Sequence, residues 1–163
     1  MEIEKKIQVS VVMGSQSDWL TMKGACDILQ KFNVSFEKKI VSAHRTPDRL
    51  YEYSNSLTKR KVKVVIAGAG GAAHLPGMIA SKTDVPVIGV PINATDLKGL
   101  DSLYSIVQMP RGYPVATMAI GAPGAFNAAI FAIQVLAVSD IIISRKIKEW
   151  RFDTTNQVKD EPE

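Results

Sequence analysis

VKVVIAGAGGAAHLPGM, residues 62–78, is an apolar run that ends in a glycine-rich turn carrying one histidine. The β-branched residues at 62–67 predict a buried strand of a parallel sheet, which we expect to stop at Gly68. Gly68, Gly70 and Gly71 remove side chains where another group must approach the backbone closely. The glycines alone leave open whether that group is a ligand or another segment of the protein.

The rest of the chain alternates strand and helix patterns on both sides of this stretch. We predict strands at residues 7–13, 34–41, 62–67, 85–90 and 115–120. We predict helices at residues 18–32, 47–57, 76–81, 100–107, 125–138 and 139–150. Strands that alternate with helices favour right-handed βαβ units, so the predicted fold class is α/β: a three-layer α/β/α domain with a doubly wound, flavodoxin-like parallel sheet.

Two of these helices begin at residues that commonly cap helices. Ser17 or Asp18 is a candidate N-cap for the first helix, and Thr46 followed by Pro47 combines a cap with a first-turn proline. No linker or repeat divides the chain. Residues 1–150 are predicted to form a single domain and residues 151–163 a polar, frayed C-terminal tail.

Composition narrows the functional classes. The net charge of +4 is modest and only 7% of the 163 residues are aromatic, so the pattern disfavours nucleic-acid binding. The single cysteine, Cys26, excludes a disulfide framework and is predicted to be a small core residue. The N-terminus lacks a signal-peptide pattern and no apolar run is long enough to span a bilayer, so we expect no membrane association and a cytoplasmic protein.

Three loops are predicted to meet at one edge of the sheet. Parallel strands place their carboxyl ends at the same edge, and ligands bind there where the strand order reverses. The loops that leave the first three strands are GSQSD (14–18), SAHRTP (42–47) and AGAGGAAHLPG (67–77), and together they contain both histidines of the chain.

The first loop offers two hydroxyls and a carboxylate at the start of a helix, from Ser15, Ser17 and Asp18. These groups suit hydrogen bonds to a sugar or a phosphate, helped by the helix dipole. Helix capping alone explains them equally well.

The second loop places Ser42, His44 and Arg45 around the next helix N-terminus. An arginine beside exposed backbone donors can clamp a phosphate, and a histidine two residues from a hydroxyl is a candidate proton carrier. A lone loop histidine is more often structural than catalytic, but the position of His44 at the predicted ligand edge favours a catalytic role.

The third loop does not match the common nucleotide motifs. No Gly-Lys-Ser/Thr follows the glycines, and no acidic ribose partner follows them at the spacing of a nicotinamide site. Spacing also suggests no ligands that would complete a zinc site with the two histidines. A serine hydrolase is disfavoured because the Gly-x-Ser-x-Gly elbow is absent.

Taken together, GSQSDW (14–19), SAHRTP (42–47) and AGAGGAAHLPGM (67–78) resemble the bacterial 5-(carboxyamino)imidazole ribonucleotide mutases of purine biosynthesis. The resemblance continues through PVIGVP (86–91), MPRGYPVATMAIG (109–121) and NAAIFA (127–132). It implies that a carboxylate moves from the exocyclic nitrogen of an imidazole ribonucleotide to a ring carbon, giving 4-carboxy-5-aminoimidazole ribonucleotide. No metal and no cofactor are implied.

The resemblance also implies the residues of the site. His44 would be the acid/base that protonates the nitrogen, releases carbon dioxide and later removes the ring-carbon proton. A small-residue pocket closed by His74 and Leu75 would keep the gas dry and close. The expected substrate-binding residues are Ser15, Ser17, Asp18, Ser42, Ala43, Arg45, Gly70, Gly71, Ala72, His74 and Leu75.

Subtype and assembly follow from the same resemblance. Arg45 and Thr46 indicate the mutase type, since animal-type relatives that carboxylate aminoimidazole ribonucleotide with free carbon dioxide tend to have Lys-Gly there. Family members form homo-octamers, and the apolar C-terminal half fits that assembly, although it would equally cover the sheet. The apolar residues of this half are Phe126, Phe131, Ile141, Ile142, Ile143 and Trp150.

Pro123 departs from the family pattern and leaves the local loop geometry open.

Two readings from other classes remain at this point. A flavin carrier would use the same fold but has no need of His44 or Arg45. A non-catalytic nucleotide-sensing module would bind the same ribonucleotide without converting it.

Overall fold

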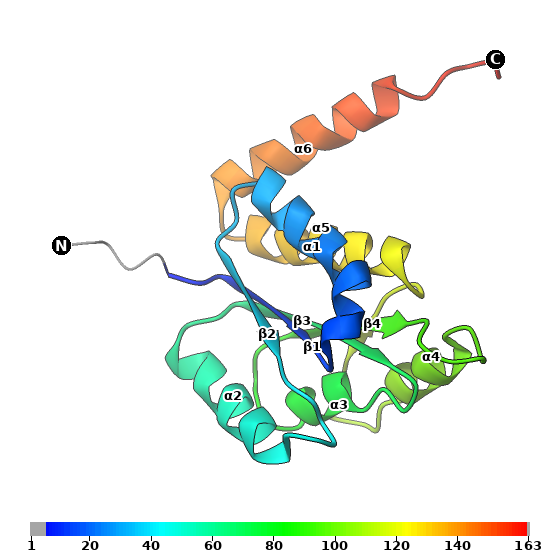
Figure 1. The fold of residues 1–163 in the computed structure, drawn as a ribbon. Coiled ribbons are helices and arrows are strands. Elements are labelled where there is room, and N and C mark those ends of the chain that lie inside the picture. Colours follow the sequence, from blue (N-terminus) through cyan, green and yellow to red (C-terminus); the bar gives the residue numbers. More distant parts are fainter. Residues whose placement is uncertain (1–5, 163) are drawn as a thin grey trace.

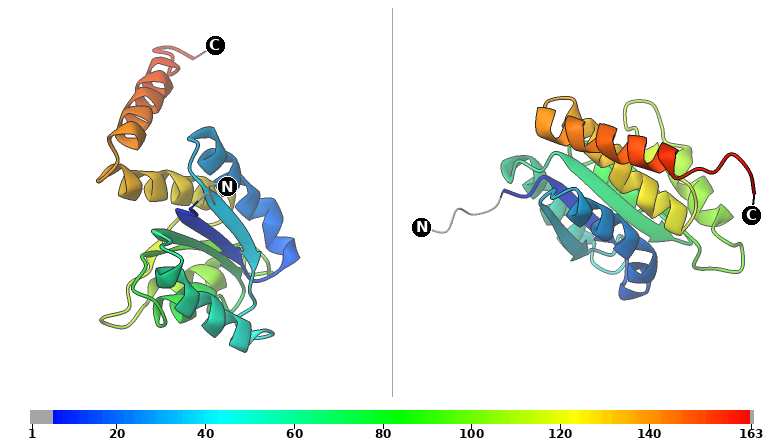
Figure 2. Two further views of the ribbon diagram at one scale, coloured as in Figure 1. Left: turned by 90° about the vertical axis from the view of Figure 1, so that its left-hand side faces the viewer. Right: turned by 90° about the horizontal axis from the view of Figure 1, so that it is seen from above.

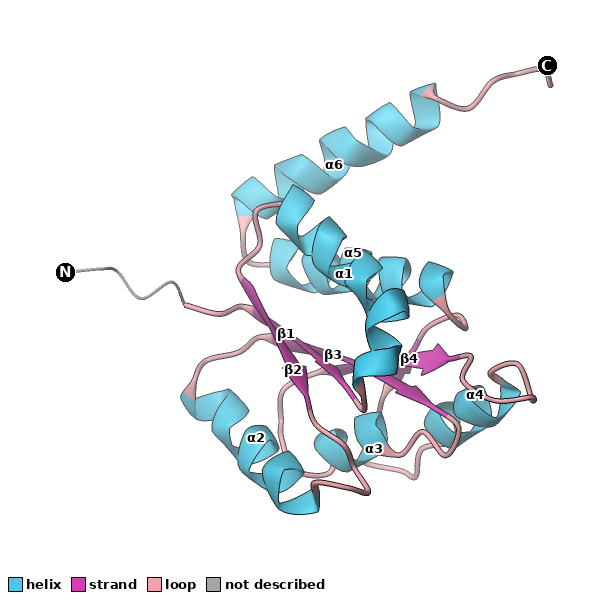
Figure 3. Ribbon diagram, in the orientation of Figure 1, coloured by secondary structure: helices cyan, strands magenta, loops and turns pink. Residues whose placement is uncertain are grey.

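A five-stranded parallel sheet forms the middle layer of the protein. The computed structural model describes residues 6–162, and its strands form the central magenta layer of Figure 3. All neighbouring strands run parallel. Their spatial order, β2-β1-β3-β4-β5, reverses direction between β1 and β3 and confirms the doubly wound, flavodoxin-like prediction. The strands are β1 (Val9–Met13), β2 (Phe36–Ile40), β3 (Val64–Gly70), β4 (Val87–Ile92) and β5 (Ala116–Thr117).

Helices cover both faces of this sheet (Figure 1). One face carries α1 and α5, which pack against each other, and the opposite face carries α2, α3 and α4. The last helix, α6, packs on α5 and projects away from the sheet, as Figure 2 shows. The helices are α1 (Trp19–Lys31), α2 (Pro47–Lys59), α3 (Leu75–Ala80), α4 (Leu100–Val107), α5 (Ala122–Ala137) and α6 (Ile141–Asn156), with a short 3₁₀ helix, η1 (Gln16–Asp18), before α1.

Two apolar cores lie on opposite sides of the sheet. Side chains alternate along each strand, so that Val11 faces α1 and α5 whereas Val12 faces α2 and α3. The central strands β1 and β4 are buried along their whole length, as expected for parallel strands covered on both faces. Cys26 lies in the core beside α5, as predicted, and burial raises the pKa of its thiol to about 11.

The predicted end of the third strand at Gly68 is wrong. β3 continues to Gly70, because Gly68 and Gly70 pair with Val90 and Ile92 of β4. A Cβ on Gly68 would collide with the sulfur of Met22 in α1. At Gly68, therefore, the group that approaches the backbone is another part of the protein.

Three further boundaries differ from the predictions by three residues or more, and the others differ by at most two. The strand predicted at 115–120 shrinks to Ala116 and Thr117, because only these residues pair in register with β4, while Met118 and Gly121 each add a single amide hydrogen bond to it. α5 begins at Ala122 and so places Pro123 in its first turn, where the missing N–H costs no hydrogen bond. α6 continues to Asn156 because residues 151–156, although polar, contain no glycine or proline that would stop a helix.

The helix starts at residues 18–19 and 46–47 are confirmed, but the expected side-chain caps are not. Asp18 bonds back to the Ser15 amide, and the Thr46 hydroxyl donates to the Ser42 carbonyl. Each side chain is therefore hydrogen-bonded to the backbone of the loop that precedes its helix.

Among residues 6–162, no helix is both long and apolar enough to cross a lipid bilayer.

Candidate active site

The three predicted loops meet beyond the carboxyl ends of β1, β2 and β3. They surround a cavity of about 320 Å³, so the predicted convergence is confirmed. Eleven of the twelve predicted site residues line this cavity directly, and His44 is among them. Gly71 is not part of the lining, although its neighbours Gly70 and Ala72 are, and Ser15 also borders a second cavity. The lining consists of Gly14, Ser15, Ser17, Asp18, Ser42, Ala43, His44, Arg45, Ala69, Gly70, Ala72, His74, Leu75 and Ala94.

The first loop presents a buried carboxylate and two hydroxyls. The Ser15 amide donates to Asp18 Oδ2 over 2.9 Å, and the Ser15 and Ser17 hydroxyls are hydrogen-bonded to each other. Asp18 is only 6% exposed, and burial raises its pKa above the usual 3.8 even though the Ser15 hydrogen bonds oppose the shift. The loop thus offers a desolvated acceptor beside exposed hydroxyls.

The second loop carries a guanidinium that connects it to the first loop. Arg45 Nη2 donates to the Gly14 carbonyl over 2.9 Å, and Arg45 Nε donates to Ser42 Oγ over 3.1 Å. Ser42 is buried whereas Arg45 is exposed, so the cation faces the open side of the cavity. An anionic group entering there would meet a pre-oriented arginine.

The two histidines connect the second loop to the third. His44 Nε2 lies 2.7 Å from His74 Nδ1, and the rings meet edge to face. One ring must donate and the other accept, so the pair holds a proton between the two nitrogens. Both rings are exposed in this chain, which means that the rim of the cavity is open to solvent. The expected dry pocket is therefore not formed by His74 and Leu75 alone, because both histidines project past the strand ends.

The third loop forms a floor without large side chains. Gly70, Ala72 and Leu75 line the cavity, and Leu75 is buried against the core beneath. A Cβ added to Gly70 would lie 2.5 Å from the Ala94 Cβ, so this glycine is required by packing against the segment after β4. Gly71 takes the left-handed conformation, with φ +65°, and its N–H donates to Ser102 on α4.

A second cavity of about 300 Å³ adjoins the first. It shares Ser15, Ser42 and Arg45 with the first cavity and extends to Arg49 on α2. Arg49 was not predicted from the sequence, although it lies in the first turn of the helix predicted from Pro47 and so follows the same loop as Arg45. Two arginines therefore border this second cavity.

A larger cavity of about 780 Å³ opens at the opposite, amino-terminal edge of the strands. Its lining comes from the second half of α2, from residues 80–87 and from residues 112–114, and contains neither a histidine nor an arginine. The two histidines and Arg45 lie at the other edge, around the smaller cavity.

Two further residues near the cavity, Ala94 and Ser102, were not predicted from the sequence. Ala94 follows β4 and completes the cavity wall, and Ser102 lies behind the third loop. Within residues 6–162, no three His, Cys, Asp or Glu side chains are grouped so that they could hold a metal ion.

Comparison with known proteins gives consistent matches. A model of the AIR carboxylase family matches residues 8–157. The chain is 58% identical over 150 residues to the N5-carboxyaminoimidazole ribonucleotide mutase of Bacillus subtilis, covering 92% of this chain and 93% of that protein. It is 54% identical to the N5-carboxyaminoimidazole ribonucleotide mutase of Haemophilus influenzae, over 99% of this chain and 98% of that protein.

Similar folds occur among solved structures. The crystal structure of Treponema denticola PurE superposes with a TM-score of 0.84 at 24% identity, covering 92% of each chain. This match concerns the fold alone.

Proposed function

Because the chain belongs to the AIR carboxylase family, we propose that it is an N5-carboxyaminoimidazole ribonucleotide mutase in which His44 is the acid and base. The reaction moves a carboxylate from the exocyclic nitrogen of the imidazole ribonucleotide to ring carbon 4, a step of purine nucleotide synthesis. The observation that carries the role of His44 is its position at a cavity that also contains Arg45, Asp18 and the glycine floor.

In the proposed reaction His44 gives up one proton and later takes one back. His44 donates a proton to the exocyclic nitrogen as the N–C bond breaks, which leaves a neutral amine and carbon dioxide. Carbon 4 then attacks the carbon dioxide, and His44 removes the proton from that carbon. Because a histidine exchanges protons near neutral pH, one side chain can perform both transfers. His74, hydrogen-bonded to His44, holds the ring at the rim.

Substrate binding is assigned by charge and position. Arg45, Ser42 and the hydroxyls of Ser15 and Ser17 bind the phosphate, with Arg49 extending the positive end. The Asp18 carboxylate accepts from the ribose hydroxyls. The backbone from Ala43 and along residues 70–75 holds the base and its carboxylate, and the bound imidazole ring covers the small-residue floor so that carbon dioxide stays between ring and loop.

We also propose the mutase subtype, a homo-octamer and a cytoplasmic location. Arg45 and Thr46 support the mutase over direct carboxylation. Ile141 and Ile142 are about two-thirds exposed in the single chain and lie on the projecting α6, where other copies can cover them. Of the other apolar residues considered, Ile143 is buried against the core and Trp150 packs on it, while Phe126 and Phe131 are partly exposed. A free buried thiol at Cys26 suits a reducing compartment.

The test is a turnover assay with N5-carboxyaminoimidazole ribonucleotide, without ATP and bicarbonate. The wild-type chain should form the 4-carboxy product. His44→Asn should lower kcat by about a thousandfold, the size typical of losing a general acid/base, while product binding measured by calorimetry stays within a few-fold. Thermal unfolding of both proteins controls for folding.

Each assay result that differs from this expectation indicates a different function or mechanism. Full activity in His44→Asn would contradict the acid/base role. Binding without turnover by the wild type would indicate a sensor, and stoichiometric uptake of flavin would indicate a flavin carrier. Product formed only from aminoimidazole ribonucleotide and added bicarbonate would indicate the carboxylase subtype.

A further inference from the structure

A fully buried serine of α4 lies behind the glycine floor of the cavity and connects this floor to the end of β4. Ser102, near the start of α4, accepts a hydrogen bond from the Gly71 amide over 2.9 Å and donates to the Ile92 carbonyl over 2.7 Å. We propose that Ser102 is a positioning residue that fixes the third loop in the shape that retains carbon dioxide. The proposal rests on the mutase function proposed above and extends it to a residue that does not touch the cavity.

The loop needs such a support because its turn is not fixed by regular structure. Gly71 follows the last residue of β3, and its left-handed backbone turns the chain toward Ala72 and His74. Gly70 and Ala72, on either side, line the cavity. A hydrogen bond at Gly71 therefore sets the position of the two lining residues next to it.

Ser102 is itself held in place by its neighbours. Its amide donates to Asp101 Oδ1 over 2.9 Å, and Asp101 Oδ2 accepts from the Thr95 hydroxyl over 2.6 Å. The Thr95 hydrogen bond lowers the pKa of Asp101, so this acceptor is ionised under physiological conditions. Ser105 adds a weaker contact to the Gly71 carbonyl at 3.4 Å and bonds more closely to the Asp101 carbonyl.

A hydroxyl is the group that this position requires. It must accept from one backbone amide and donate to one backbone carbonyl at the same time, in a site with no exposure to water. Alanine would leave the Gly71 N–H and the Ile92 carbonyl without this partner, and an unpaired amide would favour other loop conformations.

The expected consequence concerns the fate of carbon dioxide in each turnover. After the N–C bond breaks, the bound intermediate pair either forms the C–C bond or loses carbon dioxide to solvent and releases aminoimidazole ribonucleotide. A loosened loop favours escape. The ratio of aminoimidazole ribonucleotide released to 4-carboxy product formed therefore measures how well the loop is held.

The test measures this ratio in wild type, Ser102→Ala and Ser102→Thr, with enzyme-free substrate breakdown subtracted. Ser54→Ala is the matched control, because Ser54 is also fully buried and donates to a backbone carbonyl, that of Leu50, yet borders the large cavity at the opposite edge of the strands. We expect Ser102→Ala to raise the ratio about tenfold, the factor that corresponds to one buried hydrogen bond. Ser102→Thr, which restores the hydroxyl, and Ser54→Ala should stay close to wild type.

The ratio does not depend on how much of a variant is folded, since both products come from the same active molecules. An unchanged ratio in Ser102→Ala would overturn the proposal, as would an equal rise in Ser54→Ala or in Ser102→Thr. The proposed function fails separately: in that case wild type itself forms no 4-carboxy product.

Discussion

The two faces of the sheet are built differently. The face under α1 and α5 is packed with apolar side chains from strand and helix alike. The face under α2, α3 and α4 also has an apolar core, but three of the buried polar side chains described in residues 6–162 lie there: Ser10, Ser54 and Ser102. The other two, Asp18 and Ser42, lie at the rim of the site.

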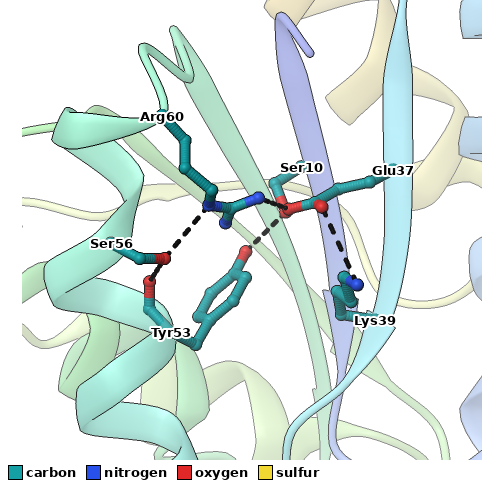
Figure 4. Close-up of polar contacts among 6 residues, drawn as sticks. All are labelled: Ser10, Glu37, Lys39, Tyr53, Ser56 and Arg60. Carbon is teal, nitrogen blue, oxygen red and sulfur yellow. Dashed lines mark hydrogen bonds and ion pairs between the residues drawn. The ribbon is translucent and has the colours of Figure 1, made fainter. Parts of the chain in front are cut away.

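The polar groups of the second face connect elements that apolar contacts alone would leave free to slide. Figure 4 shows one such network. Ser10 of β1 is hydrogen-bonded to the Tyr53 hydroxyl of α2 over 2.7 Å and donates to Glu37 of β2 over 2.8 Å. Arg60, just after α2, completes the network with a 2.7 Å ion pair to Glu37. These contacts fix the edge strand against α2, and the loop with His44 runs between those two elements.

This difference between the two faces indicates which face determines the stability of the protein and which determines the position of the loops. Apolar packing is strong but not directional, whereas a buried hydrogen bond adds little net stability and specifies one arrangement. The apolar face should therefore control how much protein is folded. The polar face should control how the loops are presented.

The largest effect on stability is expected from the apolar face. Leu29 on α1 is fully buried, and Leu29→Ala should lower the free energy of unfolding by about 3 kcal/mol through lost burial and the remaining cavity. Urea unfolding at fixed protein concentration measures this. Leu20→Ala on the same helix is the control, because Leu20 is 89% exposed. A loss of activity per folded molecule in Leu29→Ala would contradict the idea that the apolar face controls only how much protein is folded.

A smaller effect is expected from the polar face. Tyr53→Phe removes the hydroxyl that pairs with Ser10, while Ser10 keeps Glu37 as a partner, so the cost should be about 1 kcal/mol. The measurement is the same urea unfolding, with Tyr51→Phe on the more exposed side of α2 as the control. If Tyr53→Phe proved more stable than wild type, burial of the hydroxyl would outweigh its hydrogen bond.

Much of this fold was predictable because it follows from local patterns. The β-branched run at 62–67 does form most of a strand, although with shifted ends, and the helix beginning at Thr46 and Pro47 appears as expected. The errors occur where tertiary contacts decide. The extension of β3 to Gly70 depends on pairing with β4, and the short β5 depends on how far it reaches along its single neighbour.

The site shows the same division. Topology predicts that loops 14–18, 42–47 and 67–77 share one edge, and they do. The hydrogen bond between His44 and His74 and the link from Gly71 to Ser102 join residues about thirty positions apart, and no spacing rule signals them. The substrate-binding roles of the lining residues stay predictions until ligand binding is measured.

The smallest expected effect lies at the rim between the two faces, at Asp18. Burial raises the pKa of this carboxyl above 3.8, so the folded chain holds its proton more tightly than the unfolded chain does. Below pH 3.8 both states are protonated. As the pH rises from there, the unfolded chain ionises first, and stability falls until Asp18 ionises in the folded chain as well.

Asp18→Asn tests this pH dependence, because asparagine stays neutral and its Oδ1 can still accept from the Ser15 amide. The difference in Tm, variant minus wild type, should therefore grow more positive from acid to neutral pH, while KM rises if Asp18 binds the ribose. Asp27→Asn, at an exposed carboxylate on α1, controls for the loss of one negative charge. A Tm difference that is constant with pH would show that burial does not oppose the charge. If the Tm difference rises with pH and KM is also raised, the Asp18 carboxylate serves ligand binding at the expense of stability. The rim of the site would then differ from both faces of the sheet.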